Sequence, residues 1–159
     1  MHEIEPYYQW RDDYVSAETT WGNNGVSAFR VDVLNVMTNN RKVEVDYKVI
    51  VPEDCELDIS NKFGHVTLAS HSESVKLDVS HGNIRARKLE DVKQIKLEYG
   101  KMNVKKMEEA DLVLHFADVS IDEASELNIE SVSSEIEIEQ LEKINIESKH
   151  DKILIEELK

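Results

Sequence analysis

Residues 127–158 read LNIESVSSEIEIEQLEKINIESKHDKILIEEL, and this stretch decides the fold class. Isoleucine is its dominant apolar residue and stands at alternate positions, as in Ile136-Glu137-Ile138-Glu139. A two-residue period is typical of strands with one buried face, whereas an amphipathic helix places apolar residues three and four apart. β-Branched side chains also favour strands. The stretch therefore predicts short, half-buried strands and not a helix.

The same pattern recurs along most of the chain every 17 or 18 residues. Each repeat contains one small or turn-prone residue, here called the anchor: Gly64, Gly82, Gly100, Ala117, Ser134 and Asp151. Four columns, named by their distance from the anchor, are apolar in almost every repeat. They are the −5 column (Ile59, Leu77, Ile95, Leu112, Ile129, Ile146), the +2 column (Val66, Ile84, Met102, Val119, Ile136, Ile153), the +4 column (Leu68, Ala86, Val104, Ile121, Ile138, Ile155) and the +7 column (His71, Leu89, Met107, Ala124, Leu141, Leu158). Only His71 breaks the rule.

Each repeat reads as a strand, a tight corner at the anchor, a second strand and a loop. Two four-residue strands cannot bury an apolar face alone, but stacked repeats align their inward columns into one continuous core. We therefore predict an all-β fold, a single-stranded β-helix or β-solenoid of about six rungs over residues 57–159. At about 4.8 Å per rung, the rod is roughly 29 Å long. The usual crossover rule favours a right-handed coil.

Residues 1–56 do not follow the repeat. Alternating residues predict strands at 31–36 and 43–49, and the TNNR segment at 38–41 has hairpin-turn chemistry. The WGNNG segment at 21–25 marks another turn. We expect these strands to form a hairpin-like cap continuous with the first rung, because a bare terminal rung exposes unpaired backbone groups. No comparable cap follows Ile155, which hints at truncation, dimerisation or stacking at the solenoid ends.

Composition narrows the classes of partner. The 159 residues suffice for one domain with a real core, and the net charge is −14, from 19 basic and 33 acidic side chains. This charge opposes binding to nucleic acid or to anionic lipid and favours cations or basic partners. No run approaches the ~18 apolar residues of a spanning helix, so we expect no membrane insertion, and no signal peptide opens the chain.

The single cysteine, Cys55, excludes an intrachain disulfide and a cysteine-rich zinc site. We expect it to pack as a small hydrophobic residue, in preference to a role as a reactive thiol. His81 and His150 lie four rungs apart, roughly 19 Å, which is too far to share a metal ion. An Asp-x-Asp-x-Asp-Gly loop, the usual calcium motif, is missing. We expect no metal-binding and no cofactor-binding residues.

Four segments together resemble a known family. They are YKVIVP at 47–52, LDISNKFGHVTL at 57–68, VSHGNI at 79–84 and LEYGKMNV at 97–104. They resemble the adhesin-like family of bacterial envelope β-solenoid domains, whose function is unknown, and the resemblance covers residues 43–158. It implies a β-solenoid in the cell envelope or outside the cell. Members usually carry an export signal and earlier rungs, which this sequence lacks, and the family has no catalytic residues to transfer.

Two columns near the corners contain residues that are not aliphatic. The column just before the anchor reads Phe63, His81, Tyr99, Phe116, Ser133 and His150. Rings one rung apart can pack against each other, which predicts a structural aromatic ladder at one corner; a ligand-facing aromatic strip is the alternative. Three rungs carry polar residues in the −3 column, namely Asn61, Ser131 and Ser148. We expect these polar groups to hydrogen-bond the corner backbone.

Charge is unevenly distributed along the repeats. Residues 81–106 contain eight basic and three acidic residues, a net of +5, whereas residues 107–159 contain four basic and sixteen acidic residues, a net of −12. In the +3 and +5 columns, basic residues give way to acidic ones along the axis: Arg85, Arg87 and Lys105, then Asp122, Glu137, Glu139 and Glu156. The plain interpretation is a solvated face. The alternative is a docking surface for another copy or for a basic ligand.

Half of the aromatic residues lie near the N-terminus: Tyr7, Tyr8, Trp10, Tyr14 and Trp21. Exposed Tyr and Trp can stack on sugar rings, so Tyr7, Tyr8, Trp10 and Trp21 are candidate glycan contacts. Covering the open end of the solenoid would require the same residues.

Function is specified less well than fold. The chain has no Gly-x-Ser-x-Gly, phosphate-binding glycine loop or His-Glu-x-x-His motif, so we expect no catalytic residues. Our first hypothesis is a non-catalytic envelope module, an adhesin-like binder or scaffold with a glycan or another envelope protein as partner. The alternatives are a polysaccharide lyase or hydrolase on a β-helix and a self-associating structural element that forms homo-oligomers through the solenoid ends.

Overall fold

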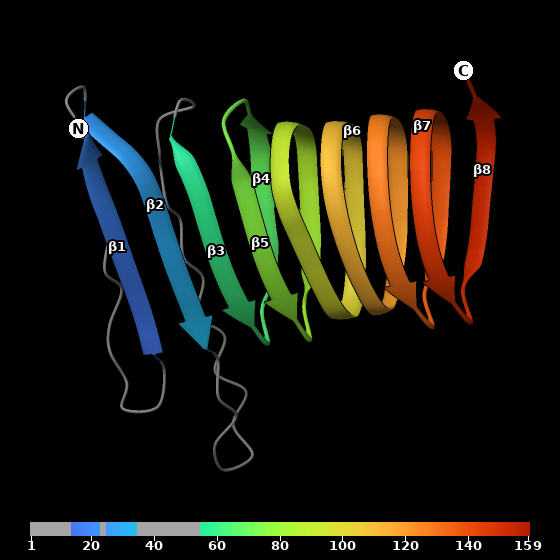
Figure 1. The fold of residues 1–159 in the computed structure, drawn as a ribbon. Coiled ribbons are helices and arrows are strands. Elements are labelled where there is room, and N and C mark those ends of the chain that lie inside the picture. The colour runs from blue at the N-terminus through green and yellow to red at the C-terminus, as the bar shows by residue number, and fades with distance from the viewer. Residues whose placement is uncertain (1–13, 23–24, 35–54) are drawn as a thin grey trace, which may run out of the picture.

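The computed structural model describes residues 14–22, 25–34 and 55–159, and these form strands and connecting turns without a helix. The strands are β1 (Tyr14–Gly22), β2 (Gly25–Leu34), β3 (Glu56–Lys62), β4 (Val66–His71), β5 (Val75–Ser80), β6 (Asn83–Val132), β7 (Glu135–Lys149) and β8 (Lys152–Leu158). From β3 onward the chain winds into a rod of stacked coils (Figure 1). The predicted β-solenoid of about six turns is confirmed.

Neighbouring turns pair in parallel, in the register that the sequence columns predict. β4 lies beside β6 with Val66 opposite Ile84 and Leu68 opposite Ala86. Further along, the partners are 17 residues apart, as for Val119 of β6 and Ile136 of β7. Residues of one column are therefore direct neighbours on successive turns. This is why isoleucine at one position is followed by an apolar residue 17 or 18 positions later.

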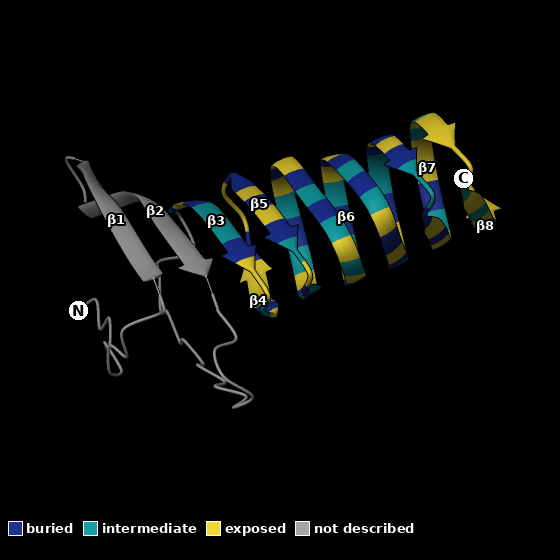
Figure 2. Cartoon of the chain, turned by 90° about the horizontal axis from the view of Figure 1, so that it is seen from below, coloured by how far each residue is buried: buried dark blue, intermediate teal, exposed yellow. Residues whose placement is uncertain are grey.

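The apolar columns fill one continuous core. Buried and exposed residues alternate along β5, β6 and β7, which appears as bands of colour in Figure 2. Burial declines at the last turn, where Ile153 and Ile155 are only partly buried and Leu158 is 65% exposed. No further rung of the described chain covers these side chains.

The N-terminal hairpin is continuous with the solenoid sheet. β1 and β2 pair antiparallel, with Gly22 opposite Gly25. Residues 23–24, at the centre of the turn predicted at 21–25, lie outside the described residues. β2 then pairs in parallel with β3, from Ala28 opposite Glu56 to Leu34 opposite Lys62. Residues 31–34 of the strand predicted at 31–36 belong to β2. The strand predicted at 43–49 and the turn at 38–41 lie outside the described residues.

The first rung has a polar residue in its +7 column. His71 is buried beside Leu89 of the next turn, and its Nε2 donates a hydrogen bond of 2.6 Å to the carbonyl oxygen of Cys55. This bond lets an imidazole occupy a core position, because a buried polar group needs a partner. Cys55 itself is fully buried, as expected for a packed small residue.

Each corner contains a residue with positive φ, one position before the anchor. The φ values are 65° at Phe63, 55° at His81, 54° at Tyr99, 51° at Phe116, 52° at Ser133 and 61° at His150. The bend itself includes the anchor in the first two repeats, at Phe63 and Gly64 and at His81 and Gly82, so the predicted corner is located correctly there while the positive φ falls on the residue before the anchor. Two glycine anchors also allow close approach: a Cβ on Gly82 would lie 1.8 Å from the carbonyl oxygen of Gly64, and one on Gly100 would lie 1.8 Å from that of Gly82.

Side chains of the anchor and of the residue after it satisfy the corner backbone. The hydroxyl of Ser134 accepts a hydrogen bond from the N–H of Ala117 (3.2 Å), and Asp151 Oδ1 accepts one from the N–H of Ser134 (2.6 Å). In the earlier turns, Asn83 Oδ1 accepts from the N–H of Lys101 (3.0 Å) and His65 Nδ1 from that of Asn83 (3.2 Å). Each bond joins adjacent turns.

The expectation that the −3 column would bond the corner backbone is wrong. The hydroxyl of Ser131 donates instead to Asp151 Oδ2 (2.8 Å), a side-chain oxygen. Ser148 is exposed, and the buried Oδ1 of Asn61 has no hydrogen-bond partner. The anchor lies closer to the bend, so its side chain reaches the unpaired amides first.

Two adjacent substitutions test the assignment of faces. Ile136 is fully buried and Glu137 exposed. We expect Ile136→Asp to lower the free energy of unfolding by about 3–5 kcal/mol, because it buries an unpaired charge. Glu137→Lys should change it by less than about 0.5 kcal/mol. Urea denaturation followed by circular dichroism measures both, and equal losses would contradict the assigned faces.

Candidate functional site

Four rings form a continuous stack along one corner of the solenoid. This aromatic ladder consists of Phe63, His81, Tyr99 and Phe116, and each successive pair of ring centroids is 5.0 Å apart. The interplanar angle falls along the ladder, from 41° between Phe63 and His81 to 2° between Tyr99 and Phe116. The predicted stacking of this column is confirmed.

The ladder stands outside the core. Phe63, Tyr99 and Phe116 are 50%, 52% and 53% exposed, because a corner residue with positive φ directs its side chain away from the solenoid interior. Since the rings face one another, their edges are presented to solvent. Ser133 follows Phe116 in the column, so no ring of the described residues covers the far face of Phe116. The exposed feature is a narrow apolar strip about 15 Å long, three spacings of 5.0 Å.

The backbone does not require aromatic residues at these corners. Positive φ costs most L-residues about 1–2 kcal/mol, and Gly or Asn would adopt it more easily. Ring stacking contributes about 0.5–1.5 kcal/mol per pair, which offsets a cost of the same order. The ladder is therefore roughly neutral for stability, and its solvent-exposed apolar surface is available for contact.

Polar side chains border the ladder on both sides. On one side, Lys101 Nζ lies 2.6 Å from Asp118 Oδ2. On the other, Glu98 accepts a hydrogen bond from Lys96 (3.0 Å) and lies 3.8 Å from His115. The hydrogen bond from Lys96 lowers the pKa of the Glu98 carboxyl, which favours the charged acceptor. An apolar strip with donors and acceptors along both borders suits an extended polar ligand.

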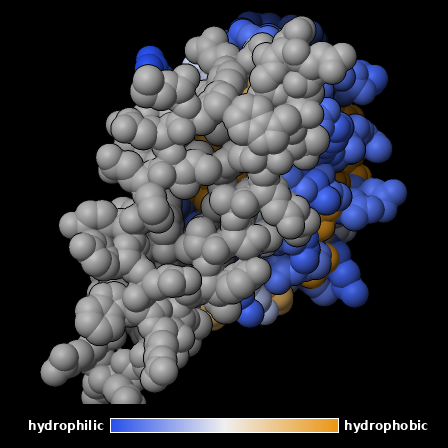
Figure 3. Space-filling view, turned by 90° about the vertical axis from the view of Figure 1, so that its left-hand side faces the viewer, coloured by the Kyte–Doolittle hydropathy of each residue, from blue (hydrophilic) through white to orange (hydrophobic). Residues whose placement is uncertain are grey.

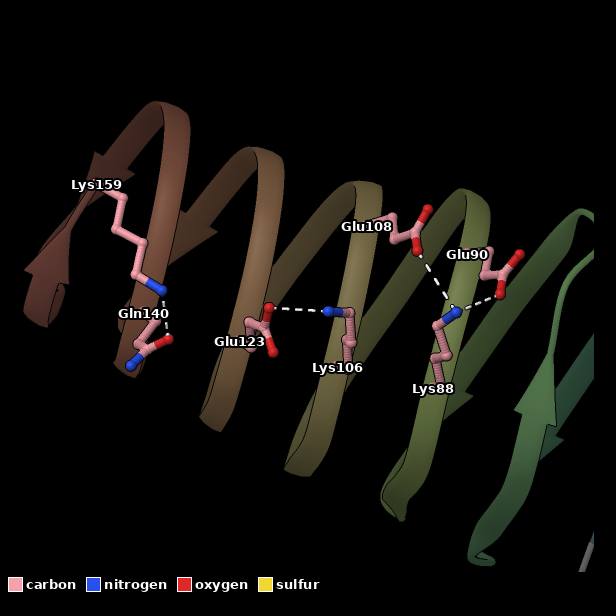
Figure 4. Close-up of polar contacts among 7 residues, drawn as sticks. All are labelled: Lys88, Glu90, Lys106, Glu108, Glu123, Gln140 and Lys159. Atoms are coloured by element: carbon pink, nitrogen blue, oxygen red, sulfur yellow. Dashed lines mark hydrogen bonds and ion pairs between the residues drawn. The ribbon is translucent and has the colours of Figure 1, made fainter.

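Most charged side chains on a separate edge neutralise one another between turns. Figure 4 shows Lys88 in contact with Glu90 and Glu108, and Lys106 Nζ 2.8 Å from Glu123 Oε1. The bond from Lys106 lowers the pKa of Glu123, and the bond to Glu90 raises the pKa of Lys88. At the last turn Lys159 donates to Gln140 (2.8 Å). These pairs leave little net charge at that edge.

The charged face, by contrast, is not neutralised. The charged face consists of the outward residues of the +3 and +5 columns. Seen from the N-terminal end of the rod, the coloured surface beside the grey residues is mostly hydrophilic, with smaller apolar areas between (Figure 3). Among the described residues, the charged members of this face make no ion pair with any other: Arg85, Arg87, Lys105, Asp122, Glu137, Glu139 and Glu156. The predicted progression from basic to acidic along the axis therefore lies on one sheet of the solenoid.

The other candidate residues remain apart. Within the part of the chain that the structure describes, no three His, Cys, Asp or Glu side chains lie close enough to hold a metal ion, and no helix could cross a membrane. Trp21 belongs to β1, opposite Val26 at a register shift. Tyr7, Tyr8 and Trp10 lie outside the described residues. Glycan contact by the N-terminal aromatic residues stays a prediction.

Substitutions of Tyr99 measure how ring stacking and positive φ at a ladder position affect the free energy of unfolding. We expect Tyr99→Asn to lower the free energy of unfolding by about 1 kcal/mol, since lost stacking is partly offset by an easier positive φ. Tyr99→Val loses the same contacts and keeps the strain, so it should cost about 1–2 kcal/mol more than Asn. Chemical denaturation of both variants gives the comparison. Equal losses would show that φ strain at the corner is negligible.

Comparison with protein-family models, with curated proteins and with solved structures gives no match for this chain.

Proposed function

We propose that the chain is a non-catalytic module of the cell envelope that binds a glycan along the aromatic ladder. The observation that carries this proposal is the half exposure of three bulky rings at corners where the backbone favours smaller residues. Exposed aromatic surface of this kind is more typical of binding sites than of side chains that only pack within the fold. The rigid stack of parallel turns holds the rings in a fixed line, which limits the entropy lost on binding.

The shape and charge of the strip favour a particular ligand class. A strip about 15 Å long and one ring wide fits an extended chain better than a compact molecule. Lys101, Asp118 and Glu98 beside it offer both donors and acceptors, which suits hydroxyl groups. The net charge of −14 disfavours acidic polysaccharides. A neutral or amino-sugar glycan is therefore the proposed ligand, and an extended segment of another envelope protein is the alternative.

Support for the envelope location comes from a separate source. The resemblance of residues 43–158 to adhesin-like envelope β-solenoids favours a place at the cell surface, where glycans are available. The polysaccharide-cleaving alternative needs a carboxylic acid with a raised pKa as proton donor. Among the described carboxyl groups, hydrogen bonds from Lys96 and Lys106 lower the pKa of Glu98 and of Glu123, so neither of these two suits the role of proton donor.

The ladder can be removed without changing the corner geometry. We expect wild-type protein to bind neutral or amino-sugar glycans on an array. The triple variant Phe63→Asn, Tyr99→Asn, Phe116→Asn should bind them at least about tenfold more weakly, because buried aromatic contacts contribute much of the binding free energy. Asn tolerates positive φ, so the variant should keep the circular-dichroism spectrum of the wild type.

The matched control replaces the same column beyond the ladder. Ser133→Asn with His150→Asn places Asn at two further corners of positive φ, and it should leave binding unchanged. Wild-type protein that binds no glycan and no cell surface at high concentration would overturn the proposal. Binding that survives the triple variant would place the site elsewhere, with the N-terminal aromatic residues as the first candidates.

A further inference from the structure

The charged face has a symmetry of its own along the solenoid axis. Counting rungs by their anchors from Gly64 to Asp151, the second and third rungs carry Arg87 and Lys105 in the +5 column. The fourth and fifth carry Asp122 and Glu139 in the same column. Charge therefore reverses sign about a line between the third and fourth rungs. The +3 column repeats the pattern with Arg85 on the second rung and Glu137 on the fifth.

We propose that this face binds the same face of a second copy of the chain, with the two solenoid axes antiparallel. The twofold axis lies in the interface, parallel to the strands, between the third and fourth rungs. It places the second rung against the fifth and the third against the fourth, and it keeps each column opposite itself. The facing pairs are Arg85 with Glu137, Arg87 with Glu139, Lys105 with Asp122 and Asn103 with Ser120.

In the +3 and +5 columns, every charged residue of these four rungs faces a residue of opposite charge. In the neighbouring +1 column, Lys101 and Asp118 already pair within one chain, and Glu135 would face Asn83. Each ion pair between the copies occurs twice, because a twofold interface uses the same patch on both copies. The first and sixth rungs place no like charges opposite each other in these columns, since Thr67 faces Leu154 and Ala69 faces Glu156. All the charged members of the pairs are exposed or half-exposed, and none has an ion-pair partner among the described residues, so no existing contact must break.

Other occupants leave charges unpaired. A copy with parallel axes would set each rung against the same rung, so that arginine would face arginine on the second rung and glutamate would face glutamate on the fifth. A basic ligand would neutralise the acidic half and leave Arg85, Arg87 and Lys105 without partners. Stacking through the solenoid ends does not involve this face at all. Like charges stacked on adjacent rungs repel, and only the antiparallel copy removes the repulsion in both halves.

The association is expected to be weak. The +3 and +5 columns and the neighbouring +1 column, taken over six rungs, cover roughly 13 by 29 Å. This is about 400 Å² per copy, below the usual size of a stable interface. The net charge of −14 on each copy also opposes approach. Self-association should therefore appear at high protein concentration and moderate salt, where long-range repulsion is screened and close pairs persist.

Charge reversal tests the pairing directly. Arg87→Glu and Glu139→Arg should each raise the dimer dissociation constant about tenfold or more, because each turns two attractive contacts into two repulsive ones. The double variant Arg87→Glu, Glu139→Arg regenerates both pairs across the twofold axis and should dimerise like the wild type. Sedimentation equilibrium over a concentration series measures all four proteins.

The controls separate specific pairing from overall charge. Glu139→Arg makes the chain less negative, so general electrostatics predicts stronger association and the proposed interface predicts weaker. Glu130→Arg makes the same change at an exposed −4 position away from the face, and it should not weaken the dimer. A wild type that stays monomeric at all concentrations would overturn the proposal. So would a double variant that fails to dimerise, or a dimer indifferent to Arg87→Glu.

Discussion

The whole structure depends on one constraint: each turn must repeat the backbone path of the previous turn at hydrogen-bonding distance. The closeness is plainest at the glycine anchors, where a single added carbon on Gly82 would lie 1.8 Å from the carbonyl oxygen of Gly64. Parallel pairing then places every residue on its counterpart 17 or 18 positions away. A side chain is therefore surrounded by residues of its own column, and the column, more than the single residue, is the unit on which stability depends.

Stacking similar side chains on successive turns stabilises the core but destabilises a charged surface. Apolar columns gain from it, because identical branched side chains fill a shared core. Charged columns lose unless their signs alternate between turns. Lys101 beside Asp118, and Glu135 beside Lys152, show such alternation in the +1 column. The charged face lacks it, and the aromatic ladder exposes apolar rings. Both surfaces depart from the pattern in which neighbouring turns neutralise each other's exposed charges, and both functional proposals rest on them.

Sequence reasoning predicted the parts of the fold that periodicity controls. The isoleucine alternation around Ile136 and the spacing of the anchors were enough to assign strands, register and core. They did not assign the positive φ to Phe63 or Tyr99, because bulky residues seldom adopt it and glycine stood next to them. Nor did they find the bonds from Ser134 and Asp151 to the corner amides, since a pattern along the chain does not say which neighbouring turn a side chain reaches. The ladder was visible as a column, but its exposure follows from the left-handed corner.

The register of adjacent turns is the central claim, and an engineered disulfide tests it most directly. Ser120 and Glu137 are paired across adjacent turns and both lie on the outer surface. Neighbouring parallel strands place such Cα atoms about 4.8 Å apart, within the range that a disulfide spans. The variant Ser120→Cys, Glu137→Cys should form the intramolecular bond on mild oxidation, detected by mass spectrometry, with an unchanged circular-dichroism spectrum. Efficient bonding in the out-of-register variant Ser120→Cys, Glu139→Cys, with none in the in-register one, would contradict the account.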